Sequence, residues 1–443
     1  MFRKLYLKNF KVWGDQLWDE GVELAPVTLL LGTNSAGKTS LLQMLLFLKQ
    51  TFESPDRHLD LNFGGQQEAD LVDLGSFESV VHAHDSKSLL GLGFDLAETP
   101  GAAAAPGIEY RVEYRHATGV TVLKSLAIKS GAGHYGATRQ AKGGYLLSAP
   151  GYRPKRITEE RAEARRLFQP ERSLTFPPDA LAAIGGAAQM VQDVSLEIRQ
   201  QFEKIAYLGP LRSYPKRFYT WNQQNPGDIG KQGQYAAYAL LASANAVKNP
   251  RREDEGGRGW LVEKVSQWLK RIGVADSMKL VRQGKSTNYD VVITTQGREA
   301  NIMDVGFGVS QVLPMLVLAY FVPRGATIVA EQPEIHLHPL AQSALADLMV
   351  EVASERKVQF IVETHSEHMF RRLQFLIADE QLARDDCRLY FINRGARDDA
   401  VLENLRVDDY GKIENWPENF FGDALGETER QMRRILERMR NHQ

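Results

Sequence analysis

The stretch Gly32-Thr33-Asn34-Ser35-Ala36-Gly37-Lys38-Thr39 decides how the chain folds. It matches the pattern G-x-x-x-x-G-K-[ST] at every fixed position. An apolar run precedes it at residues 27–31, and apolar residues recur on a helical period across residues 40–48. In this order of strand, loop and helix, the loop N–H groups can face phosphate oxygens, and the helix adds the positive end of its dipole. The stretch therefore predicts a phosphate-binding loop rather than a glycine-rich turn without a ligand.

Two side chains of this loop are expected to carry its chemistry. Lys38 is predicted to reach the β- and γ-phosphates of ATP, and the Thr39 hydroxyl is predicted to bind Mg²⁺. The other positions are expected to line the nucleotide: Gly32, Asn34, Ser35, Ala36, Gly37 and Ser40. The sequence thus predicts a nucleotide-binding protein with ATP and Mg²⁺ as cofactors.

Composition limits the classes of protein that remain. The chain has 443 residues, a formal net charge of −1 and one cysteine, Cys387. The near-zero net charge gives no overall attraction to nucleic acid or membranes, although local basic patches are possible. A single cysteine excludes an intramolecular disulfide and a cysteine-based zinc cluster, and it suits a reducing cytosol.

No segment of the sequence is expected to enter a membrane. The chain begins with an alternating strand pattern and not with a signal peptide. Residues 311–330 are apolar enough to imitate a membrane span, but Pro314 and the turn Pro323-Arg324-Gly325 interrupt them. We predict a buried helix, a turn and a strand there, and a cytoplasmic location.

The middle of the chain leaves several interpretations open. Residues 89–148 alternate as strands do and predict a β-rich lobe. Residues 152–172 mix Arg and Glu on a helical period, which favours a solvated helix over a nucleic-acid surface. The basic and aromatic cluster at 212–221 fits base stacking and interdomain packing equally well. The glutamines of 62–67 could touch the metal or an attacking water, although a polar turn is favoured.

Three further segments predict the other half of the nucleotide site. Residues 326–331 form a buried strand pattern that ends in the carboxylate Glu331, as a metal-side Walker B strand does. A second apolar strand at 358–362 is followed by Glu363-Thr364-His365-Ser366, whose histidine could hydrogen-bond a γ-phosphate. The glycine-rich turn at 304–311 opens a helix, and helix N-termini favour phosphate.

Taken in this order, these elements resemble the ABC-type ATPase heads of the RecF, SMC and OLD group of AAA-family ATPases. The string Glu331-Gln332-Pro333-Glu334-Ile335-His336-Leu337-His338-Pro339 carries most of the resemblance, together with the segments 207–212 and 364–366. The resemblance covers roughly residues 1–50 and 300–395. It is strongest to stand-alone bacterial ATPases, several of which are subunits of anti-phage defence cassettes.

The resemblance implies an α/β ABC-type head, with a core sheet behind the phosphate loop, a β-rich lobe, a helical insertion and no long coiled coil. The implied domains are an N-terminal ATPase lobe (1–150), a helical, basic insertion (151–275), a C-terminal ATPase lobe (276–410) and a helical tail (411–443). Two heads are expected to pair head to tail with ATP between them, as a homodimer or a larger homo-oligomer. A separate effector, a nuclease or another toxin, is the expected partner, and nucleic acid remains possible.

The resemblance also assigns roles to single residues. Glu331 takes the metal-side carboxylate position, and His365 is the switch histidine. Gly306, Gly308 and Ser310 would approach the γ-phosphate bound by the partner. His338 and Pro339 would begin the interface segment. A zinc site at His336, His338, His365 and His368 is the weaker alternative.

The sequence departs from the family pattern at three places. Gln332 stands where the family has the glutamate that polarises water, and losing a general base typically costs about 10²–10⁴-fold in rate. Glu334 could substitute for it. Gly306 occupies the expected place of the signature serine, and no TOPRIM nuclease is expected after the strand at 389–392. These features leave three hypotheses: a slow ATPase that gates an effector, an ATP-sensing scaffold, and a RecF-like DNA-binding repair ATPase.

Overall fold

The computed structural model describes residues 1–65, 70–97, 107–117, 119–131, 133–141, 143–153, 168–245, 257–395, 399–417, 432 and 434. Several predictions on the sequence fall outside this set. They are the glutamines Gln66 and Gln67, most of the Arg- and Glu-rich segment at 152–172, and most of the helical tail expected at 411–443.

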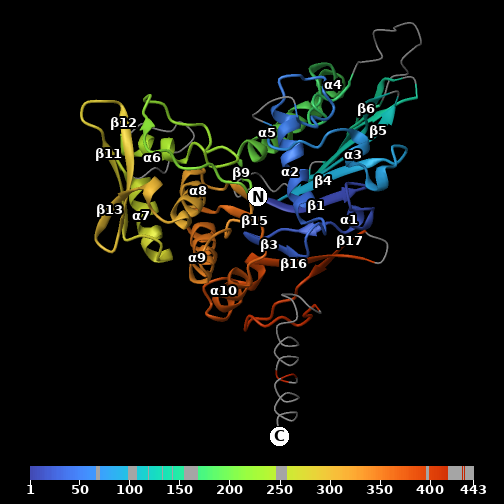
Figure 1. Cartoon of the computed structure of the whole chain (residues 1–443). Helices are drawn as coiled ribbons and strands as arrows, with labels where there is room; N and C mark the ends of the chain where they lie inside the picture. Colours follow the sequence, from blue (N-terminus) through green and yellow to red (C-terminus); the bar gives the residue numbers. More distant parts are fainter. Residues whose placement is uncertain are drawn as a thin grey trace.

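A six-stranded sheet forms the centre of the molecule (Figure 1), in the order β17-β16-β3-β15-β14-β9. Its strands are β3 (Val27–Gly32), β9 (Ile205–Leu208), β14 (Thr327–Glu331), β15 (Gln359–Glu363), β16 (Cys387–Arg394) and β17 (Ala400–Asn404). All neighbours pair in parallel except β16 and β17. The central strands β3, β14 and β15 are apolar and almost wholly buried, as expected for strands covered on both faces. Their carboxyl ends meet at one edge, where ligands of parallel sheets commonly bind.

An antiparallel sheet of seven strands builds the β-rich lobe, in the order β2-β1-β4-β5-β6-β7-β8. Its strands are β1 (Phe2–Lys8), β2 (Val22–Glu23), β4 (Leu90–Leu96), β5 (Glu109–Ala117), β6 (Val120–Ser130), β7 (Gly133–Arg139) and β8 (Tyr145–Ser148). Helix α2 (Lys38–Glu53) packs in one core with this sheet and with α4 (Pro178–Ile184) and α5 (Ala188–Glu203). The helix that starts at the phosphate loop is therefore held by the β-rich lobe.

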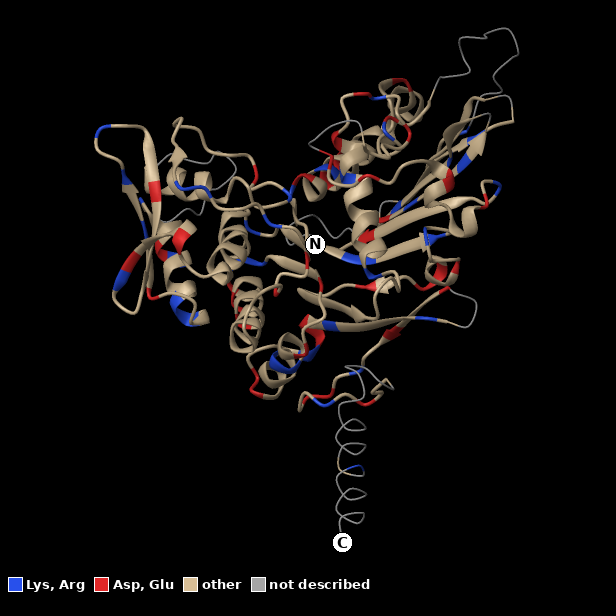
Figure 2. Cartoon of the chain, viewed as in Figure 1, with Lys and Arg blue, Asp and Glu red and all other residues tan. Residues whose placement is uncertain are grey.

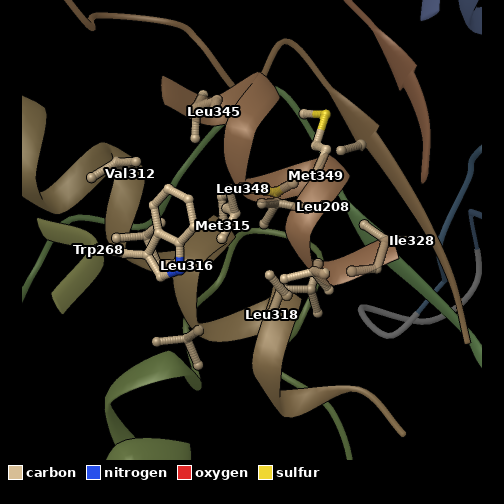
Figure 3. Close-up of a cluster of buried hydrophobic side chains, with 14 of the residues drawn as sticks. Leu208, Trp268, Val312, Met315, Leu316, Leu318, Ile328, Leu345, Leu348 and Met349 are labelled. Carbon is tan, nitrogen blue, oxygen red and sulfur yellow. The ribbon is translucent and has the colours of Figure 1, made fainter. Parts of the chain in front are cut away.

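A second core lies on the other face of the central sheet. It contains helices α6 (Ala236–Ala244), α7 (Trp260–Ile272), α8 (Phe307–Phe321), α9 (Pro339–Arg356) and α10 (Glu367–Ala378). The outer sheet consists of β10 (Tyr219–Thr220), β11 (Ser277–Arg282), β12 (Asn288–Thr295) and β13 (Arg298–Asn301). In this core, Trp268 lies among Val312, Met315 and Leu316 of α8 (Figure 3), and its Nε1 donates to the Tyr320 hydroxyl at 2.7 Å.

Short elements complete the described chain: α1 (Gln16–Asp19), α3 (Phe77–Val80), and the 3₁₀ turns η1 (His82–His84), η3 (Gly185–Ala187), η4 (Ile302–Asp304) and η5 (Arg384–Asp386). Lys and Arg alternate with Asp and Glu over both lobes (Figure 2), in line with the near-zero net charge.

The predicted fold class, an α/β head with a β-rich lobe, is confirmed. The longest helix among the described residues is α9, with 18 residues, so no long coiled coil occurs in that part of the chain. Every helix that the structure describes is too short or too polar to cross a bilayer. The proposed domain boundaries stay a prediction. Within 151–275, α4 and α5 pack in the first core, whereas α6 and α7 pack in the second.

One local expectation was wrong, because Pro314 does not interrupt its helix. Helix α8 continues through it from Phe307 to Phe321. Proline costs an interior hydrogen bond, and thirteen of the fifteen residues of α8 are buried, so surrounding packing holds the helix together. The ring also packs tightly against Gly233, where an added Cβ would lie 2.4 Å from Pro314 Cβ.

Candidate functional site

The phosphate loop joins β3 to α2, and two of its glycines are required by the backbone. Gly37 has φ +110°, and an added Cβ would lie 2.6 Å from Val12 Cγ2. Gly32 has φ +139°, and its Cβ would lie 1.9 Å from the backbone oxygen of Ile392 on β16. Since no other residue fits either conformation without moving neighbouring strands, the loop can take this shape only with glycine at both ends.

The loop is anchored from both lobes. Trp13 Nε1 donates to the Gly37 oxygen at 3.2 Å, and Arg394 at the end of β16 donates from Nε and a terminal nitrogen to the Ser35 oxygen at 3.1 and 2.9 Å. The tip of the loop at 33–35 is exposed. The exposed tip includes Asn34 and Ser35, so some of the predicted phosphate-binding residues are exposed, whereas Ala36 and Ser40 are buried.

Lys38 and Thr39 both turn toward the neighbouring strand β15. Lys38 Nζ donates to the backbone oxygens of Gly32 and Thr33 at 3.1 and 2.7 Å, and it lies 4.0 Å from Glu363 Oε1. Burial lowers the pKa of Lys38, and Glu363 acts in the opposite direction. Thr39 Oγ1 donates to Glu363 Oε2 at 2.7 Å. The two side chains predicted to bind phosphate and metal thus share a carboxylate partner.

Two carboxylates lie side by side at the edge where the strands end, because Glu331 and Glu363 are register partners on β14 and β15. Burial is the main cause that raises the pKa of each. Glu331 Oε1 accepts a hydrogen bond from the Tyr207 hydroxyl at 2.7 Å, on the side of β9. Glu331 and Glu363 therefore face different partners, although they are neighbours.

A buried guanidinium lies beside these carboxylates. Arg212 is 9% exposed, and one of its terminal nitrogens donates to the Glu331 backbone oxygen at 3.4 Å. Its Nε and other terminal nitrogen are buried without a hydrogen-bond partner. Burial lowers the pKa of Arg212 to about 10, and nearby Tyr207, Glu334 and Glu331 oppose that shift, so the side chain is charged at neutral pH. A buried cation with two unused donors is costly unless an anion or water completes it.

The segment after Glu331 contacts the turn that carries His365, the predicted switch histidine. Gln332 has φ +45°, and its N–H donates to the Glu363 oxygen at 2.8 Å. Glu334 is 7% exposed, and its Oε1 accepts from Thr364 Oγ1 at 2.6 Å and from the His365 N–H at 2.9 Å. Its Oε2 is buried without a partner. Glu334 therefore fixes the turn that carries His365.

His365 follows β15 and lies near the lysine of the loop. Burial, and then the positive charge of Lys38, lower the pKa of His365, which favours the neutral imidazole. Ser366 caps α10 by accepting from the Met369 N–H at 3.0 Å, and its hydroxyl donates to Gln342 at 2.6 Å. The phosphate loop, Glu331, Glu334 and His365 are thus brought to one edge of the sheet.

The expected signature residues lie elsewhere. Gly306 caps α8, and Val309 packs in the second core, whereas α2 packs in the first. Ser310 is 7% exposed and its hydroxyl donates to the Phe307 oxygen at 2.8 Å. An added Cβ at Gly308 would meet atoms only at 3.8 Å, so this position is not tightly packed. The role of Gly306, Gly308 and Ser310 toward a partner's nucleotide stays a prediction.

The basic and aromatic cluster at 212–221 is divided by the fold. Arg212, Tyr219 and Trp221 are buried, and Arg217 pairs with Asp304 through two contacts of 2.8 Å. These contacts favour the packing interpretation over a nucleic-acid surface. The His336 ring, part of the alternative zinc set, packs edge to face on Phe307 with centroids 5.2 Å apart.

Sequence reasoning missed three residues of this site: Glu363 as the partner of Thr39, and Tyr207 and Arg212 beside Glu331. Glu363 had a readable signal, because it ends an apolar strand as Glu331 does. Tyr207 belongs to β9, which has only four residues and shows no clear alternation.

The donors at this edge fit Mg²⁺, a hard cation that proteins hold through hydroxyl and carboxylate oxygens together with substrate phosphates. Thr39 supplies the hydroxyl, and Glu331 and Glu363 supply the carboxylates. Among the residues that the structure describes, no three His, Cys, Asp or Glu side chains group closely enough to hold a metal ion by themselves.

Comparison with known protein families finds matches to two segments of the chain. Residues 257–370 match the family model described as an AAA ATPase domain, and residues 382–431 match a protein family of unknown function, DUF3696. A search of curated proteins found no match.

Among solved structures, the chain is similar to SMC head domains. One is an SMC head bound to the C-winged helix domain of ScpA, with 13% identity, 91% of this chain and 98% of that chain covered, and a TM-score of 0.47. Another is the SMC head domain from Thermotoga maritima, with 13% identity, coverage of 92% and 99%, and a TM-score of 0.40. A third, derived from Pyrococcus furiosus, is an SMC head with an extended coiled coil bound to the C-terminal domain of ScpA; it has 14% identity, coverage of 99% for both chains, and a TM-score of 0.42.

The matched segment 257–370 contains Glu331, Glu334 and His365, and the fold places the phosphate loop beside them. Over residues 257–370 the chain therefore matches an AAA ATPase domain, in agreement with the ABC-type head that its motifs resemble.

Proposed function

We propose that the protein binds ATP with Mg²⁺ and hydrolyses it slowly, and that ATP-driven pairing of two heads gates a separate effector. The observation that supports this proposal most strongly is that five side chains lie together at the carboxyl-end edge of the central sheet: Lys38, Thr39, Glu331, Glu363 and His365. Arg212 supports it, since its two unused donors lie beside Glu331 and suit a phosphate or the water around it. Bound Mg²⁺ would neutralise the charge that develops on the phosphate oxygens.

Slow hydrolysis follows from the groups available to activate water. Gln332 can orient water but cannot take its proton. Glu334 is a carboxylate, but its Oε1 already accepts two hydrogen bonds from the turn of His365. A base held in this way has less freedom to meet the attacking water. Turnover well below that of ATPases with a free glutamate at position 332 is therefore expected.

Steady-state hydrolysis by four proteins tests this proposal: wild type, Lys38→Ala, Gln332→Glu and Glu334→Gln. Lys38→Ala should abolish turnover, and Gln332→Glu should raise it about tenfold or more because it restores a carboxylate. Glu334→Gln keeps an acceptor oxygen for Thr364 and His365. A loss of about 10²–10⁴-fold in this variant would identify Glu334 as the base, whereas a loss below tenfold would identify a positioning residue. Equal rates for wild type and Lys38→Ala would refute the proposed activity.

The proposed pairing of two heads is supported by exposed apolar side chains around the predicted signature segment, residues 304–311. Five large apolar side chains are exposed there or on the adjoining loop and helix: Leu211, Tyr214, Phe218, Phe307 and Leu340. Tyr214 and Phe307 are in contact, with ring centroids 6.1 Å apart. Because the signature segment and the phosphate loop pack in different cores, a second copy is the natural source of the missing half-site.

Light scattering after size-exclusion chromatography tests the pairing. ATP and Mg²⁺ should convert the Gln332→Ala variant from a monomer to a dimer, and Phe307→Asp should prevent this without weakening ATP binding by the single head. A control, Val281→Asp, changes an exposed apolar residue on the outer sheet and should dimerise normally. A mass that does not respond to ATP would refute this part of the proposal.

The second candidate is an ATP-sensing scaffold without turnover, which Gln332 favours. Tight ATP binding with no measurable hydrolysis, alone or with a partner, would select it. A RecF-like repair ATPase is less favoured, because Arg212, Tyr219 and Trp221 are buried. The separate effector and the role in anti-phage defence rest on the resemblance alone, as the cytoplasmic location rests on cysteine usage. Co-purification of the protein with the products of neighbouring genes, with and without ATP, tests the effector.

A further inference from the structure

The proposed Mg²⁺ site of this head has a carboxylate that the Walker pattern does not supply. In the sequence pattern, the metal-side acid is Glu331 at the end of β14. In the fold, β15 lies between β14 and the phosphate-loop strand β3. Glu363 is therefore one strand away from the loop and Glu331 is two, and neighbouring strands lie about 4.8 Å apart. The acid of β15 is the nearer one.

The contacts agree with this order of strands. Thr39 Oγ1, the hydroxyl expected on the metal, donates to Glu363 Oε2 at 2.7 Å. Glu331 Oε1 accepts instead from the Tyr207 hydroxyl at 2.7 Å, on the side away from β3. The carboxylate that is already in place beside the metal-binding hydroxyl is Glu363.

The surrounding charges point to a bound ligand and not to a purely structural ion pair. Glu363 has a cation near it, Lys38, but their charged atoms are 4.0 Å apart and Lys38 donates to backbone oxygens of its own loop. Arg212, nine-tenths buried, keeps two donors without partners beside Glu331. Two buried acids and two buried cations with incomplete contacts match a ligand that is itself a polyanion with a divalent cation, as ATP with Mg²⁺ is.

We propose that Glu363, together with Thr39, is the principal protein ligand set of the ATP-bound Mg²⁺, directly or through water, and that Glu331 is the outer acid of the site. This inference rests on the proposed ATP binding and deepens it. Mg²⁺ is commonly held by one or two carboxylates plus substrate phosphates. The metal should therefore bind this site well only together with the nucleotide.

The test measures the coupling between metal and nucleotide and does not depend on turnover. A fluorescent ATP analogue is titrated into the full-length protein in excess Mg²⁺ and again in EDTA, and the ratio of the two dissociation constants gives the coupling. Glu363→Gln keeps an acceptor for the Thr39 hydroxyl but removes the charge. It should lower the coupling by about tenfold or more, since changes around a metal site typically cost about 10–100-fold in affinity. Affinity in EDTA should stay the same or increase, because a negative charge near the phosphates is gone.

Two further variants keep the result interpretable. Thr39→Val should lower the coupling, and adding it to Glu363→Gln should cost little more, because contacting residues act together. Glu299→Gln, on the exposed strand β13, is the matched control and should behave as wild type. Glu363→Asp serves if Glu363→Gln fails to fold, and it should lower the coupling less than tenfold.

The possible failures can be told apart. If Glu363→Gln keeps the wild-type coupling while Glu331→Gln abolishes it, the assignment is overturned and the proposed ATP binding stands. If wild type and Lys38→Ala bind the analogue equally weakly in Mg²⁺, the proposed function fails, and this inference fails with it.

Discussion

Replacing Gln359 should separate the β-rich lobe from the central sheet. Gln359 begins β15, is 1% exposed, and uses the whole hydrogen-bonding capacity of its amide. Oε1 accepts from the Phe2 N–H at 3.1 Å and from Thr327 Oγ1 at 3.2 Å. Nε2 donates to the backbone oxygens of Phe2 at 2.7 Å and of Ala25 at 3.2 Å. One side chain thus ties the start of β1 to β15 and β14.

The expected cost of Gln359→Leu follows from these four bonds. At a net contribution of about 1 kcal/mol each, their loss removes about 4 kcal/mol. Burying a leucine of similar size returns about 1–2 kcal/mol. We therefore expect a loss of about 2–3 kcal/mol, a large share of the roughly 5–15 kcal/mol by which proteins are stable.

Hydrogen exchange is the suitable assay, because a chain with two cores need not unfold in one step. Peptides from β1 should exchange faster in Gln359→Leu by the factor that about 2–3 kcal/mol predicts, about 30- to 150-fold. Gln381→Leu is the control, since Gln381 is exposed and, within the part of the chain that the structure describes, its side chain bonds only to Asp379. If β1 exchanged no faster than in this control, the amide would not join the lobes as argued.

A charged substitution at Gln359 should make the loss of stability depend on pH. Gln359→Glu places a carboxyl against the Phe2 and Ala25 carbonyls, where burial and repulsion raise its pKa. A group with a raised folded pKa contributes its stability below its unfolded pKa and loses it as the pH rises through the folded value. The variant should therefore be more destabilised at pH 8 than at pH 5, and the opposite order would contradict the contact geometry.

Three other predictions concern the phosphate loop, Asp60 in the β-rich lobe, and Tyr207 beside Glu331. Gly32→Ala should abolish ATP binding and lower the thermal midpoint, because its Cβ would lie 1.9 Å from the Ile392 oxygen; Gly297→Ala, also at positive φ but with nothing within 4 Å, should cost only about 1 kcal/mol. Burial raises the pKa of Asp60, so Asp60→Asn should raise the thermal midpoint at pH 8, and the gain should shrink toward pH 4 as the wild-type acid is protonated; a constant gain would be evidence against this cause. Tyr207→Phe removes the 2.7 Å bond to Glu331 and should cost about 1–3 kcal/mol in calorimetry, whereas the exposed Tyr410→Phe should be neutral.

The parts of this structure that the sequence predicts are those whose signal is local. The apolar runs at 27–31 and 327–331 and the helical period at 40–48 each lie within one element, and the structure has them there. Glu331 and His365 are predicted to lie at the site because one ends and the other follows an apolar strand, whereas the role of Glu334 comes from the family resemblance.

The contacts that the sequence does not predict depend on which strands are neighbours in the sheet. The contact of Thr39 with Glu363 exists because β15 is inserted between β3 and β14. The places of Tyr207 and Arg212 exist because β9 pairs with β14. Neither pairing follows from the residues of one element, since each is decided by how the helices cover the sheet. Pro314 was misread for the same reason, because tertiary packing outweighs its local cost.

Successive side chains of the central strands pack in different cores, so these strands contact both cores of the molecule. In β3, Leu29 and Leu31 pack in the core of α8 and α9, whereas Leu30 packs in the core of α2. In β15, Phe360 and Val362 pack in the core of α8 and α9, and Ile361 packs in the core of α2. Since successive side chains point to opposite faces, a shift of either strand is felt in both cores. β15 carries Gln359 at its start and Glu363 at its end, so a ligand that draws on Glu363 acts on the strand that joins the lobes. Under the proposed binding of ATP and Mg²⁺, a nucleotide that draws on Thr39 and Glu363 would thus act on a strand that packs in both cores.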